Sequence, residues 1–354
     1  MGREKTNFIA KGDCIKEMKK MDANSIDIIF ADPPYNMQLG GDLRRPDDSK
    51  VKAVDDEWDQ FESFKTYDEF SIKWLTEAKR VMKPDASFWV IGSYHNIFRL
   101  GKILQDMGFW IMNDILWIKN NPMPNFKGTR FTNAHETLLW CTKSKNAKPT
   151  FNYHAMKTFN GDKQMRSDWY LPICSGGERR RNANGESIHS TQKPEALLHR
   201  VLLSSSNKGD LVLDPFSGSG TTAVVAKKLG RNFIGIEKEQ EYIDLTNKRL
   251  AEVETADDKI LSISQKKKIN KIPFGSLVAQ GKISAGTTLF SNNGKVKATV
   301  RVDGSLITDK GIEGSIHKVG ATVQNKASCN GWTFWSLETN GEKKSIDTFR
   351  QKVA

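Results

Sequence analysis

Cysteine and histidine are scarce in this chain of 354 residues, which has 4 Cys and 6 His. No Cys-x-x-Cys pair occurs, so the spacing predicts neither a disulfide framework nor a zinc site, and we expect reduced thiols. No two histidines have the spacing of metal ligands, so we expect no metal. The four thiols are scattered along the chain at Cys14, Cys141, Cys174 and Cys329.

Long apolar runs are also missing. None approaches the roughly 20 residues that a membrane-spanning helix needs. The chain does not open on a charged and then apolar leader either. We therefore expect no membrane association and a cytoplasmic protein.

Acidic residues are outnumbered by basic ones. The chain has 42 Asp and Glu against 54 Lys and Arg, which gives a net charge of +12. Such an excess favours a polyanionic partner, although a basic surface without a partner gives the same count. Most of the excess lies in residues 257–354, which have 14 Lys and 2 Arg against 8 Asp and Glu, a net charge of +8.

Residues 1–256 alternate short apolar runs with amphipathic patterns. Continuous apolar strands interleaved with helices are typical of a parallel sheet covered on both faces. We therefore predict an α/β catalytic domain with a doubly wound, mostly parallel sheet. The expected strands are 7–10, 26–31, 87–91, 110–118, 136–141, 211–214 and 232–236. The expected helices include 63–82, 193–205, 221–229 and 239–252.

Three segments depart from this pattern. Residues 119–190 are rich in Asn, Lys, Arg, Gly and aromatics, and an insertion of this kind in a compact α/β domain is typically functional. Residues 257–272 are polar and charged and predict a linker. Residues 273–354 carry short β-like runs separated by Gly, Asn and Asp turns, which predicts a small, largely β C-terminal module.

A glycine-rich loop follows one expected strand, in the stretch LVLDPFSGSGTTA. Gly218 and Gly220 lie between Asp214 and the start of a helix, where glycines let the backbone approach a ligand closely. A phosphate-binding loop would need Gly-Lys-Ser/Thr, which is absent. A dinucleotide fingerprint would need a third glycine where Ala223 stands. S-adenosylmethionine, with its cationic sulfonium and amino acid portion, suits a loop preceded by a carboxylate.

Glu237 ends the next expected strand, FIGIE, nineteen residues after Gly218. A carboxylate there can accept hydrogen bonds from both ribose hydroxyls of a nucleoside. A glycine turn that binds no ligand is the alternative interpretation of this segment, and a second motif weakens it.

That motif is FADPPYN, residues 30–36, at the end of the apolar run IDIIFA. Asp32 follows a central strand, so its carboxylate is expected in the crevice where ligands bind. Pro33 and Pro34 have no N–H to donate, so the main chain there offers carbonyl acceptors only. Asp32 and the Pro33 carbonyl can therefore accept the two N–H groups of an amine on a heteroaromatic ring.

Such an amine is a poor nucleophile because its lone pair is delocalised into the ring. Accepting both N–H groups draws the nitrogen toward tetrahedral geometry and frees the lone pair to attack a sulfonium methyl group. Tyr35 supplies a flat face for the base, and stacking is worth about 1–3 kcal/mol. A base in a duplex must leave the stack to reach such a pocket, so base flipping is implied. An Asp-Pro turn without function is the alternative, against which the glycine loop and Glu237 argue.

DPPY together with DPFSGSGTT resembles the amino-methyltransferases that modify DNA at adenine N6 or cytosine N4. The order of the motifs, catalytic first and cofactor-binding late, resembles their β group. The chain after Glu237 and its helix departs into the tail, so the last strand of the sheet is expected from the N-terminal segment NFIAKGDC. The resemblance thus implies a circularly permuted S-adenosylmethionine-dependent methyltransferase fold.

The resemblance also implies roles for further residues. Asp13 and Cys14 match positions near the adenine of the cofactor. HSTQKP (189–194) resembles the motif that flanks the cofactor's methionine end, although Ser190 stands where the family often has proline. The expected cofactor-binding set is completed by Thr191, Lys193, Pro194, Asp214, Phe216, Ser217, Gly218, Gly220, Thr221, Thr222 and Glu237.

A narrower resemblance covers nearly the whole chain. DDEWDQF, NPMPNFKGTRFTNAHETLLWC, KQMRSDW, STQKPEALL and GWTFW resemble adenine-N6 methyltransferases that act on GANTC sites, a group that contains both cell-cycle-regulated enzymes and companions of restriction enzymes. The tail resembles a module associated with restriction enzymes and adenine methylases. Asp rather than Ser at position 32 favours adenine over cytosine. The resemblance implies double-stranded DNA as partner and a homodimer.

The insertion at 119–190 is the expected target-recognition region. Arg130, Gln164 and Arg166 are the first candidates for base and phosphate contacts, because Arg reading guanine is the commonest specific pair. Lys163 and the run from Arg179 to Arg181 are further candidates, and the run ranks lower because it suits backbone neutralisation. A solvated basic loop explains any one of these residues equally well.

Aromatic residues in the tail have two interpretations. In GWTFW, core packing is the default for Trp332 and Trp335, and a strand there would place Trp332 and Phe334 on one face with Trp335 opposite. Stacking of Trp332 on distorted DNA is the alternative.

Together these patterns predict an enzyme that moves a methyl group from S-adenosylmethionine to adenine N6 in GANTC DNA. N4-cytosine methylation is an alternative, as is an amine in RNA or a protein glutamine, whose enzymes more often carry Asn where Asp32 stands. A DNA-binding module without activity is a third, against which the intact DPPY and GSG motifs argue.

Overall fold

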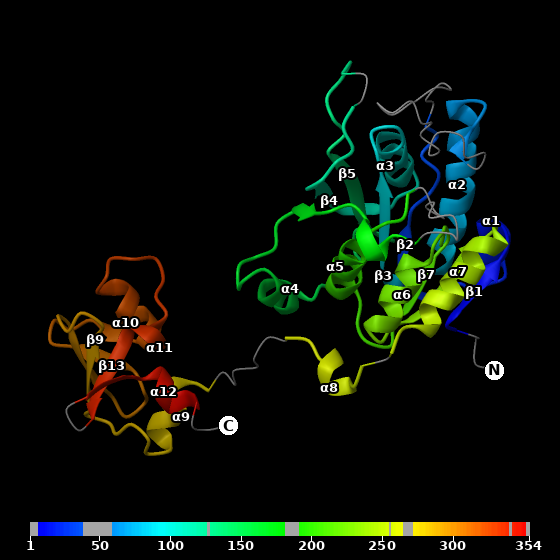
Figure 1. Cartoon of the computed structure of the whole chain (residues 1–354). Coiled ribbons are helices and arrows are strands. Elements are labelled where there is room, and N and C mark those ends of the chain that lie inside the picture. Colours follow the sequence, from blue (N-terminus) through cyan, green and yellow to red (C-terminus); the bar gives the residue numbers. More distant parts are fainter. Residues whose placement is uncertain are drawn as a thin grey trace. The chain divides into compact units, whose positions relative to one another are not determined.

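The computed structural model describes residues 6–37, 59–125, 128–180, 191–254, 256–264, 272–339 and 342–351. The chain separates into two compact units, Met1–Gln265 and Lys266–Ala354 (Figure 1). No helix in these ranges combines the length and the apolar character needed to cross a membrane.

The first unit is built on an eight-stranded sheet with the order β1-β8-β7-β2-β3-β5-β4-β6. Its pairs are parallel except where β5 meets β3 and β4, so the predicted mostly parallel sheet is confirmed. The strands are β1 (Phe8–Lys11), β2 (Ile26–Ala31), β3 (Met82–Gly92), β4 (Trp110–Lys119), β5 (His135–Thr142), β6 (Asp168–Leu171), β7 (Leu211–Asp214) and β8 (Asn232–Glu237).

The N-terminal strand pairs with the last strand of the unit, as the circular permutation requires. Phe8 is in register with Ile234 and Ala10 with Ile236, in parallel. β1 therefore occupies the position that a strand after β8 would take in an unpermuted sheet.

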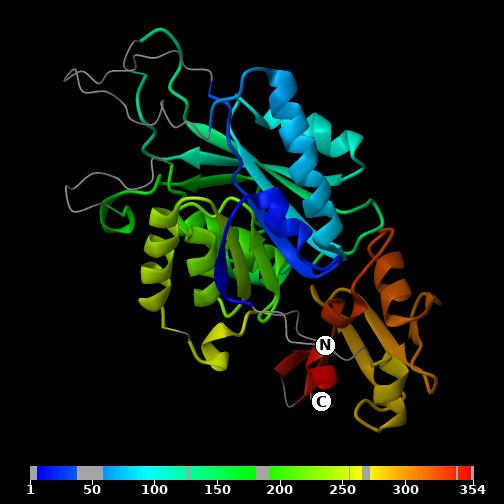
Figure 2. The ribbon, with the colours of Figure 1, turned by 90° about the vertical axis from the view of Figure 1, so that its right-hand side faces the viewer.

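Helices cover both faces of this sheet, as Figure 2 shows for the blue and cyan helices on one side and the green and yellow ones on the other. Ile29 and Ala31 of β2 belong to the core shared with α1, α2 and α3, whereas Ile28 and Phe30 belong to the core shared with α5 and α6. A strand buried on both faces is apolar, which explains the run IIFA. Asp27, near the start of the strand, is only partly buried and pairs with Lys83 at 2.6 Å. The helices of this unit are α1 (Cys14–Lys19), α2 (Phe64–Val81), α3 (Ile97–Asp106), α4 (Tyr153–Phe159), α5 (Glu195–Ser205), α6 (Thr221–Lys228), α7 (Gln240–Ala251) and α8 (Asp258–Leu261).

The segment 119–190, expected to be an insertion, is in part sheet. β5 lies between β3 and β4, and β6 is the strand at the end of the sheet order. Leu138 and Trp140 of β5 are buried in the core that includes α5, so the strand expected at 136–141 is confirmed as part of the sheet. The described residues of this segment outside the strands and α4 form loops and the short 3-10 helix Gly176–Glu178.

The second unit is a six-stranded antiparallel sheet with the order β12-β11-β10-β9-β13-β14. One face packs on short helices through Leu277, Leu289, Val319 and Trp335. Its elements are α9 (Phe274–Ala279), β9 (Thr288–Ser291), β10 (Lys297–Val300), β11 (Leu306–Thr308), β12 (Glu313–Gly314), α10 (Ile316–Thr322), α11 (Gly331–Phe334), β13 (Trp335–Thr339), β14 (Glu342–Ser345) and α12 (Asp347–Gln351).

Trp332 is part of this core, which corrects its assignment as a DNA contact. Its side chain is 7% exposed and meets the Phe274 ring edge to face with 5.9 Å between centroids. The strand expected across GWTFW is wrong for its first four residues, which form α11. The helical turn brings Trp332 and Trp335 into the same core, so the Trp332 ring presents no face for a base to stack on.

Candidate active site

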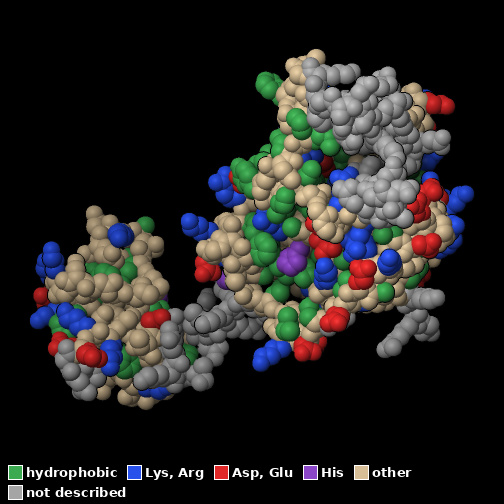
Figure 3. Space-filling view, in the orientation of Figure 1, with side chains coloured by type: hydrophobic (Ala, Val, Ile, Leu, Met, Phe, Trp, Pro, Cys, Tyr) green, Lys and Arg blue, Asp and Glu red, His purple; other side chains and the backbone are tan. Residues whose placement is uncertain are grey.

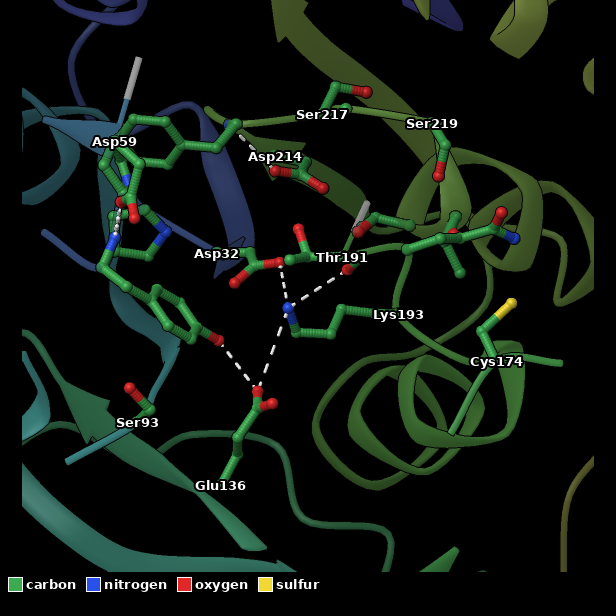
Figure 4. Close-up of a pocket in the computed structure, with 18 of the residues that line it drawn as sticks. Asp32, Asp59, Ser93, Glu136, Cys174, Thr191, Lys193, Asp214, Ser217 and Ser219 are labelled. Atoms are coloured by element: carbon green, nitrogen blue, oxygen red, sulfur yellow. Dashed lines mark hydrogen bonds and ion pairs between the residues drawn. The ribbon is translucent and has the colours of Figure 1, made fainter. Parts of the chain in front are cut away.

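One large cleft of about 1390 Å³ opens where β2, β7 and β8 end in the first unit. Its lining joins the two motifs singled out in the sequence, with Asp32 and Tyr35 from one and Asp214 and Gly218 from the other, together with Glu237. Parallel strands bring their carboxyl ends to one edge of a sheet, where ligands of open α/β folds bind. Figure 4 shows Asp32, Lys193 and Asp214 pointing into this space.

The FADPPYN loop is held by a carboxylate that the sequence did not reveal. Asp59 accepts hydrogen bonds from the backbone N–H groups of Tyr35, of Asn36 at 2.8 Å and of Met37 at 3.1 Å. Asn36 has a left-handed backbone, with φ of 54°, and this turns successive N–H groups toward one point. Asp59 is 5% exposed, so the loop conformation depends on hydrogen bonds from neutral backbone groups to a buried carboxylate.

The two proline carbonyls have different partners. The Pro34 carbonyl accepts from the Tyr67 hydroxyl at 2.9 Å and from the Asn96 amide at 3.4 Å. The Pro33 carbonyl receives no hydrogen bond within the described part of the chain. The Pro34 carbonyl thus fixes the main chain, and the Pro33 carbonyl is available to accept a hydrogen bond from a ligand.

Asp32 forms a buried ion pair with Lys193, whose Nζ lies 2.6 Å from Oδ2. Its other oxygen, Oδ1, is buried and has no hydrogen-bond partner within the described residues. Burial raises the pKa of Asp32, and Lys193 opposes that rise. An orphaned carboxylate oxygen beside a cleft indicates a ligand donor at that point.

Glu136, at the start of β5, is the second carboxylate of this region and was not predicted as a site residue. It accepts from the Tyr35 hydroxyl at 2.8 Å, pairs with Lys119 at 2.7 Å and lies 3.9 Å from Lys193. Burial alone would raise the pKa of Glu136, but Lys193 and Lys119 together lower it. The sequence signal that could have identified Glu136 is a carboxylate near the start of an otherwise apolar strand.

The glycine loop is fixed on Glu237. Its Oε2 accepts from the Gly218 N–H at 2.7 Å, and its Oε1 accepts from the N–H groups of Lys238 and Glu239 at 2.7 and 2.9 Å. A carboxylate has about four acceptor positions, so it retains capacity for a ligand hydroxyl. Ser217 Oγ is buried in the cleft lining without a partner in the described part of the chain, which marks a second point where a ligand atom fits.

Asp214 lies deeper in the same loop. Burial raises its pKa to about 7, and hydrogen bonds from the Thr222 side chain and the Phe216 N–H oppose the rise. The Phe216 N–H lies 3.0 Å from Asp214 Oδ1. Asp214 suits a cationic ligand group, because a nearby positive charge would favour its ionised form.

The remaining expected cofactor residues divide into two groups. Asp13, Cys14, Thr191, Phe216, Thr221 and Thr222 line the cleft. Asp13 also caps α1 by accepting from the N–H groups of Ile15 and Lys16. Pro194 and Gly220 are the N-cap residues of α5 and α6 and do not line the cleft. Lys193 lines it, but its ammonium lies on the Asp32 carboxylate.

Gly220 shapes the loop from outside the cleft, which leads to a first prediction. Its φ is 75°, and an added Cβ would lie 2.2 Å from Thr246 Cγ2. Gly220→Ala must therefore push the glycine loop and α7 apart, and overpacking of this kind costs roughly 1–3 kcal/mol. We expect the dissociation constant of S-adenosylmethionine to rise at least about 10-fold, because the displaced loop no longer fits the cofactor. Isothermal titration calorimetry measures this.

Gly209→Ala is the matched control. Gly209 also has positive φ, 85°, but no atom lies within 4 Å of its added Cβ. We expect Gly209→Ala to show backbone strain without any loss of cofactor affinity. Equal weakening by the two variants would mean that the contact with Thr246 is irrelevant to the loop.

The expected DNA-contacting residues are dispersed. Arg130 and Arg179 line the cleft, and Arg130 donates to the Tyr94 hydroxyl at 2.7 Å. Gln164 and Arg166 lie outside it, and Arg166 is paired with Asp168 at 2.9 Å. Next to Arg130, the Phe131 side chain is 98% exposed. Arg181, His189 and Ser190, which the sequence also singled out, lie outside the described residues.

Comparison with known proteins agrees with this geometry. Residues 26–248 match the family described as DNA methylase, and residues 255–354 match the domain described as Restriction Enzyme Adenine Methylase Associated. The chain belongs to the DNA methylase family. The methylase is 49% identical to the type II methyltransferase M.HinfI of Haemophilus influenzae over 97% of this chain and 96% of that protein. It is 44% identical to the type II methyltransferase M2.DpnII of Streptococcus pneumoniae over 70% of this chain and 91% of that protein.

Solved structures agree on the fold. The M1.HpyAVI–SAM complex has a TM-score of 0.50 and 31% identity, covering 69% of this chain and 98% of that one. The PvuII cytosine-N4-specific DNA methyltransferase has a TM-score of 0.54 over 73% of this chain and 93% of that one, and at 19% identity it supports the fold alone. The protein is thus a DNA methyltransferase that uses S-adenosylmethionine. The described residues contain no cluster of three or more His, Cys, Asp or Glu able to hold a metal ion.

Proposed function

We propose that the methylase transfers a methyl group to adenine N6 in double-stranded DNA, at GANTC sites, with the adenine extruded from the duplex. The observation that carries the proposal is the pair of unused acceptors, Asp32 Oδ1 and the Pro33 carbonyl, in the same cleft as the glycine loop. An exocyclic amine has two N–H groups, which these two acceptors match.

The residues of the chain account for the activation of the amine. Asp32 and Pro33 accept its two N–H groups, so the nitrogen leaves the plane of the ring and its lone pair becomes nucleophilic. Tyr35 supplies the stacking face, and its hydroxyl is anchored on Glu136. S-adenosylmethionine, held by the glycine loop and Glu237, supplies a methyl group on a sulfonium. After transfer the nitrogen must lose a proton, and Asp32 Oδ1 is the free acceptor beside it.

Adenine is favoured over cytosine by the Asp at position 32 and by the resemblance to GANTC methyltransferases. The lining of the cleft supports a DNA substrate, because Arg130 and Arg179 belong to it and the exposed Phe131 follows Arg130 in the chain. Arginine contacts both phosphate oxygens and guanine edges, so Arg130 and Arg179 are the proposed target-recognition contacts.

Methylation assays with purified protein test the proposal. Duplexes containing GANTC, duplexes with the site scrambled, single-stranded RNA and a glutamine-rich protein are incubated with labelled cofactor, and the nucleosides are separated by mass spectrometry. We expect N6-methyladenine in GANTC duplexes only. N4-methylcytosine, or label in RNA or protein, would replace the proposal with one of its alternatives. Absence of transfer by a protein that still binds cofactor would support a silent DNA-binding module.

The second unit is proposed to add sequence-independent affinity for the phosphate backbone. The Nζ atoms of Lys297 and Lys343 lie 5.6 and 5.5 Å from the centroid of the Phe290 ring. Figure 3 shows further Lys and Arg side chains on the face of this unit that is drawn there. Replacing both lysines by alanine should lower the salt dependence of DNA binding, by roughly 1 in the slope of log K against log salt for each lost phosphate contact.

The control pair is Lys20→Ala with Lys102→Ala, which removes the same charge from the first unit. These lysines are exposed and paired with Glu17 and Asp106. Fluorescence anisotropy between 50 and 200 mM salt measures the DNA affinity of both double variants. Over this range a protein with six phosphate contacts loses about 10³-fold in affinity or more. Identical slopes for the two double variants would remove the proposed role of the second unit.

A homodimer and a cytoplasmic location complete the proposal. The homodimer is supported by apolar side chains on the strands at one end of the sheet, where Leu116 of β4 is 38% exposed and Tyr170 of β6 is 59% exposed. Analytical ultracentrifugation at the assay concentration should give twice the monomer mass. A monomer at that concentration would contradict the proposed dimer.

A further inference from the structure

Lys193 lies between two carboxylates at the centre of the cleft (Figure 4). Its Nζ is 2.6 Å from Asp32 Oδ2 and 3.9 Å from Glu136 Oε2, and it lies 5.3 Å from the centre of the Tyr35 ring. The side chain is 8% exposed. Burial alone would lower the pKa of Lys193, but Asp32 and Glu136 raise it. The ammonium is therefore a fixed positive charge in contact with the catalytic machinery.

The position of this charge determines what Asp32 offers to a substrate. Oδ2 is occupied by Lys193, while Oδ1 is buried without a partner among the described residues. A carboxylate held through one oxygen has a fixed rotation about its last bond, so its second oxygen has a fixed direction. Glu136 completes the arrangement, because it contacts both Lys193 and the Tyr35 hydroxyl.

We propose that Lys193 is a positioning residue for the methyl-transfer reaction, which holds Asp32 ionised and turns its free oxygen toward the target amine. Glu136 fixes Lys193 and Tyr35 relative to each other. The proposal rests on the proposed function, since it deepens the role of Asp32. It differs from the role that the family resemblance implies for Lys193, which is contact with the methionine end of the cofactor.

Charge balance supports this role. Asp32, Glu136, Lys193 and Lys119 form a connected set with two carboxylates and two ammonium groups. Without Lys193, Lys119 would be the remaining ammonium group of this set, and it contacts Glu136 but not Asp32. Asp32 would have no positive charge of the set beside it. Asp32 would then be protonated over more of the working pH range, and a protonated carboxyl has lost an acceptor.

The pH dependence of kcat separates the two roles. Asp32 is faced by Lys193 from the segment before α5, Glu136 from β5, Tyr35 from its own loop and Asp214 from β7. Lys193→Met removes the positive charge, so the pKa of Asp32 rises and the acid limb of the kcat profile moves up by about one pH unit or more. Glu136→Gln removes a negative charge, so the pKa of Asp32 falls and the limb moves down.

Substitution of Lys193 should change kcat strongly and cofactor affinity little. We expect Lys193→Met to lower kcat at neutral pH roughly 100-fold, as expected for a misplaced catalytic group. Lys193→Arg keeps the charge and should leave the acid limb within a few tenths of a pH unit of the unsubstituted enzyme. Calorimetric titration with S-adenosylmethionine, without DNA and over the same pH range, should give dissociation constants within about twofold of the unsubstituted enzyme for Lys193→Met, Lys193→Arg and Glu136→Gln. The same titrations show whether ionisation of Asp214 changes the affinity for the cofactor.

Specific results would overturn the proposal. A 10-fold or greater loss of cofactor affinity in Lys193→Met with an unmoved acid limb would assign Lys193 to cofactor binding. Limbs that move in the same direction in Lys193→Met and Glu136→Gln would show that Asp32 does not respond to their charges. If Lys193→Met shows no cooperative thermal transition and is therefore unfolded, Glu136→Gln still tests the proposal. A downward shift of its acid limb would support the response of Asp32 to these charges, and an unmoved limb would contradict it. Failure of the proposed function is recognisable separately, because the unsubstituted enzyme would then not methylate adenine.

Discussion

Asp32→Ala should abolish methyl transfer while leaving cofactor binding intact. General acid–base and orienting groups contribute about 10²–10⁴-fold to rate, and in the proposed mechanism Asp32 Oδ1, which has no partner among the described residues, both accepts an N–H of the amine and takes the proton released after transfer. We therefore expect kcat to fall at least about 10³-fold. The affinity for S-adenosylmethionine should change little, because the glycine loop is held by Glu237 and not by Asp32.

Asp32→Asn is the matched variant for this experiment. It keeps the shape of the side chain and one acceptor oxygen but removes the negative charge that pairs with Lys193. We expect an intermediate loss of kcat, and the residual activity should no longer show the acid limb that Asp32 produces. Single-turnover kinetics on a GANTC duplex measures both variants. Turnover within 10-fold of the unsubstituted enzyme in Asp32→Ala would remove Asp32 from the reaction.

Asp59→Ala should have the second largest effect, although Asp59 lies outside the DPPY motif. The substitution leaves the N–H groups of Tyr35, Asn36 and Met37 without their acceptor. Buried donors left unsatisfied cost about 1–3 kcal/mol each, so we expect the free energy of unfolding to fall by on the order of 3 kcal/mol. The loop carrying Asp32 should also lose its fixed position, and kcat should fall roughly 100-fold.

Two control variants make the Asp59 experiment specific. Asp59→Asn retains one acceptor oxygen and should lose less than half as much stability as Asp59→Ala. Asp85→Ala removes an exposed aspartate that accepts a single backbone N–H, from Lys148 at 2.8 Å, and should leave kcat unchanged. Urea unfolding and steady-state assays give both readouts. A stability loss in Asp59→Ala no larger than that in Asp85→Ala would mean that the three hydrogen bonds do not hold the loop.

The features predicted from sequence are those with a local cause. The run IDIIFA predicted a strand buried on both faces, and the stretch LVLDPFSGSGTTA predicted a strand, a tight loop and a helix, because both signals lie within about a dozen adjacent residues. The order of the motifs also predicted the permuted sheet, since a strand after Glu237 had to come from another part of the chain. The pairing of Phe8 with Ile234 is that strand.

The features that escaped prediction depend on contacts between distant residues. Asp59 binds a loop 24 residues away in sequence, Glu136 reaches Tyr35 across 101 residues, and Lys193 reaches Asp32 across 161 residues. Each of these side chains lies in a segment whose own pattern does not indicate its partner. The resemblance included DDEWDQF and STQKP as motifs, but only the fold shows that Asp59 and Lys193 both act on the DPPY loop.

Two further differences arise from reading a pattern in one dimension. GWTFW has the composition of a strand, but Asn330 caps a helical turn by accepting from the Trp332 N–H, so the aromatic side chains converge on one core. Residues 119–190 are polar on average, and this average conceals β6, which ends the sheet order and was not among the expected strands, whereas β5 was expected at 136–141. Composition over a long window therefore hid one of the two strands within the predicted insertion.

A crystal structure of the methylase bound to a non-transferable cofactor analogue and a GANTC duplex would show whether the target amine meets Asp32 and the cofactor at one point. We expect the extruded adenine to stack on Tyr35 and its N6 to donate to Asp32 Oδ1 and the Pro33 carbonyl. The atom that replaces the sulfonium methyl should lie about 3–3.5 Å from N6. An analogue bound at the glycine loop with its reactive end directed away from Asp32, or an adenine bound elsewhere, would contradict this geometry.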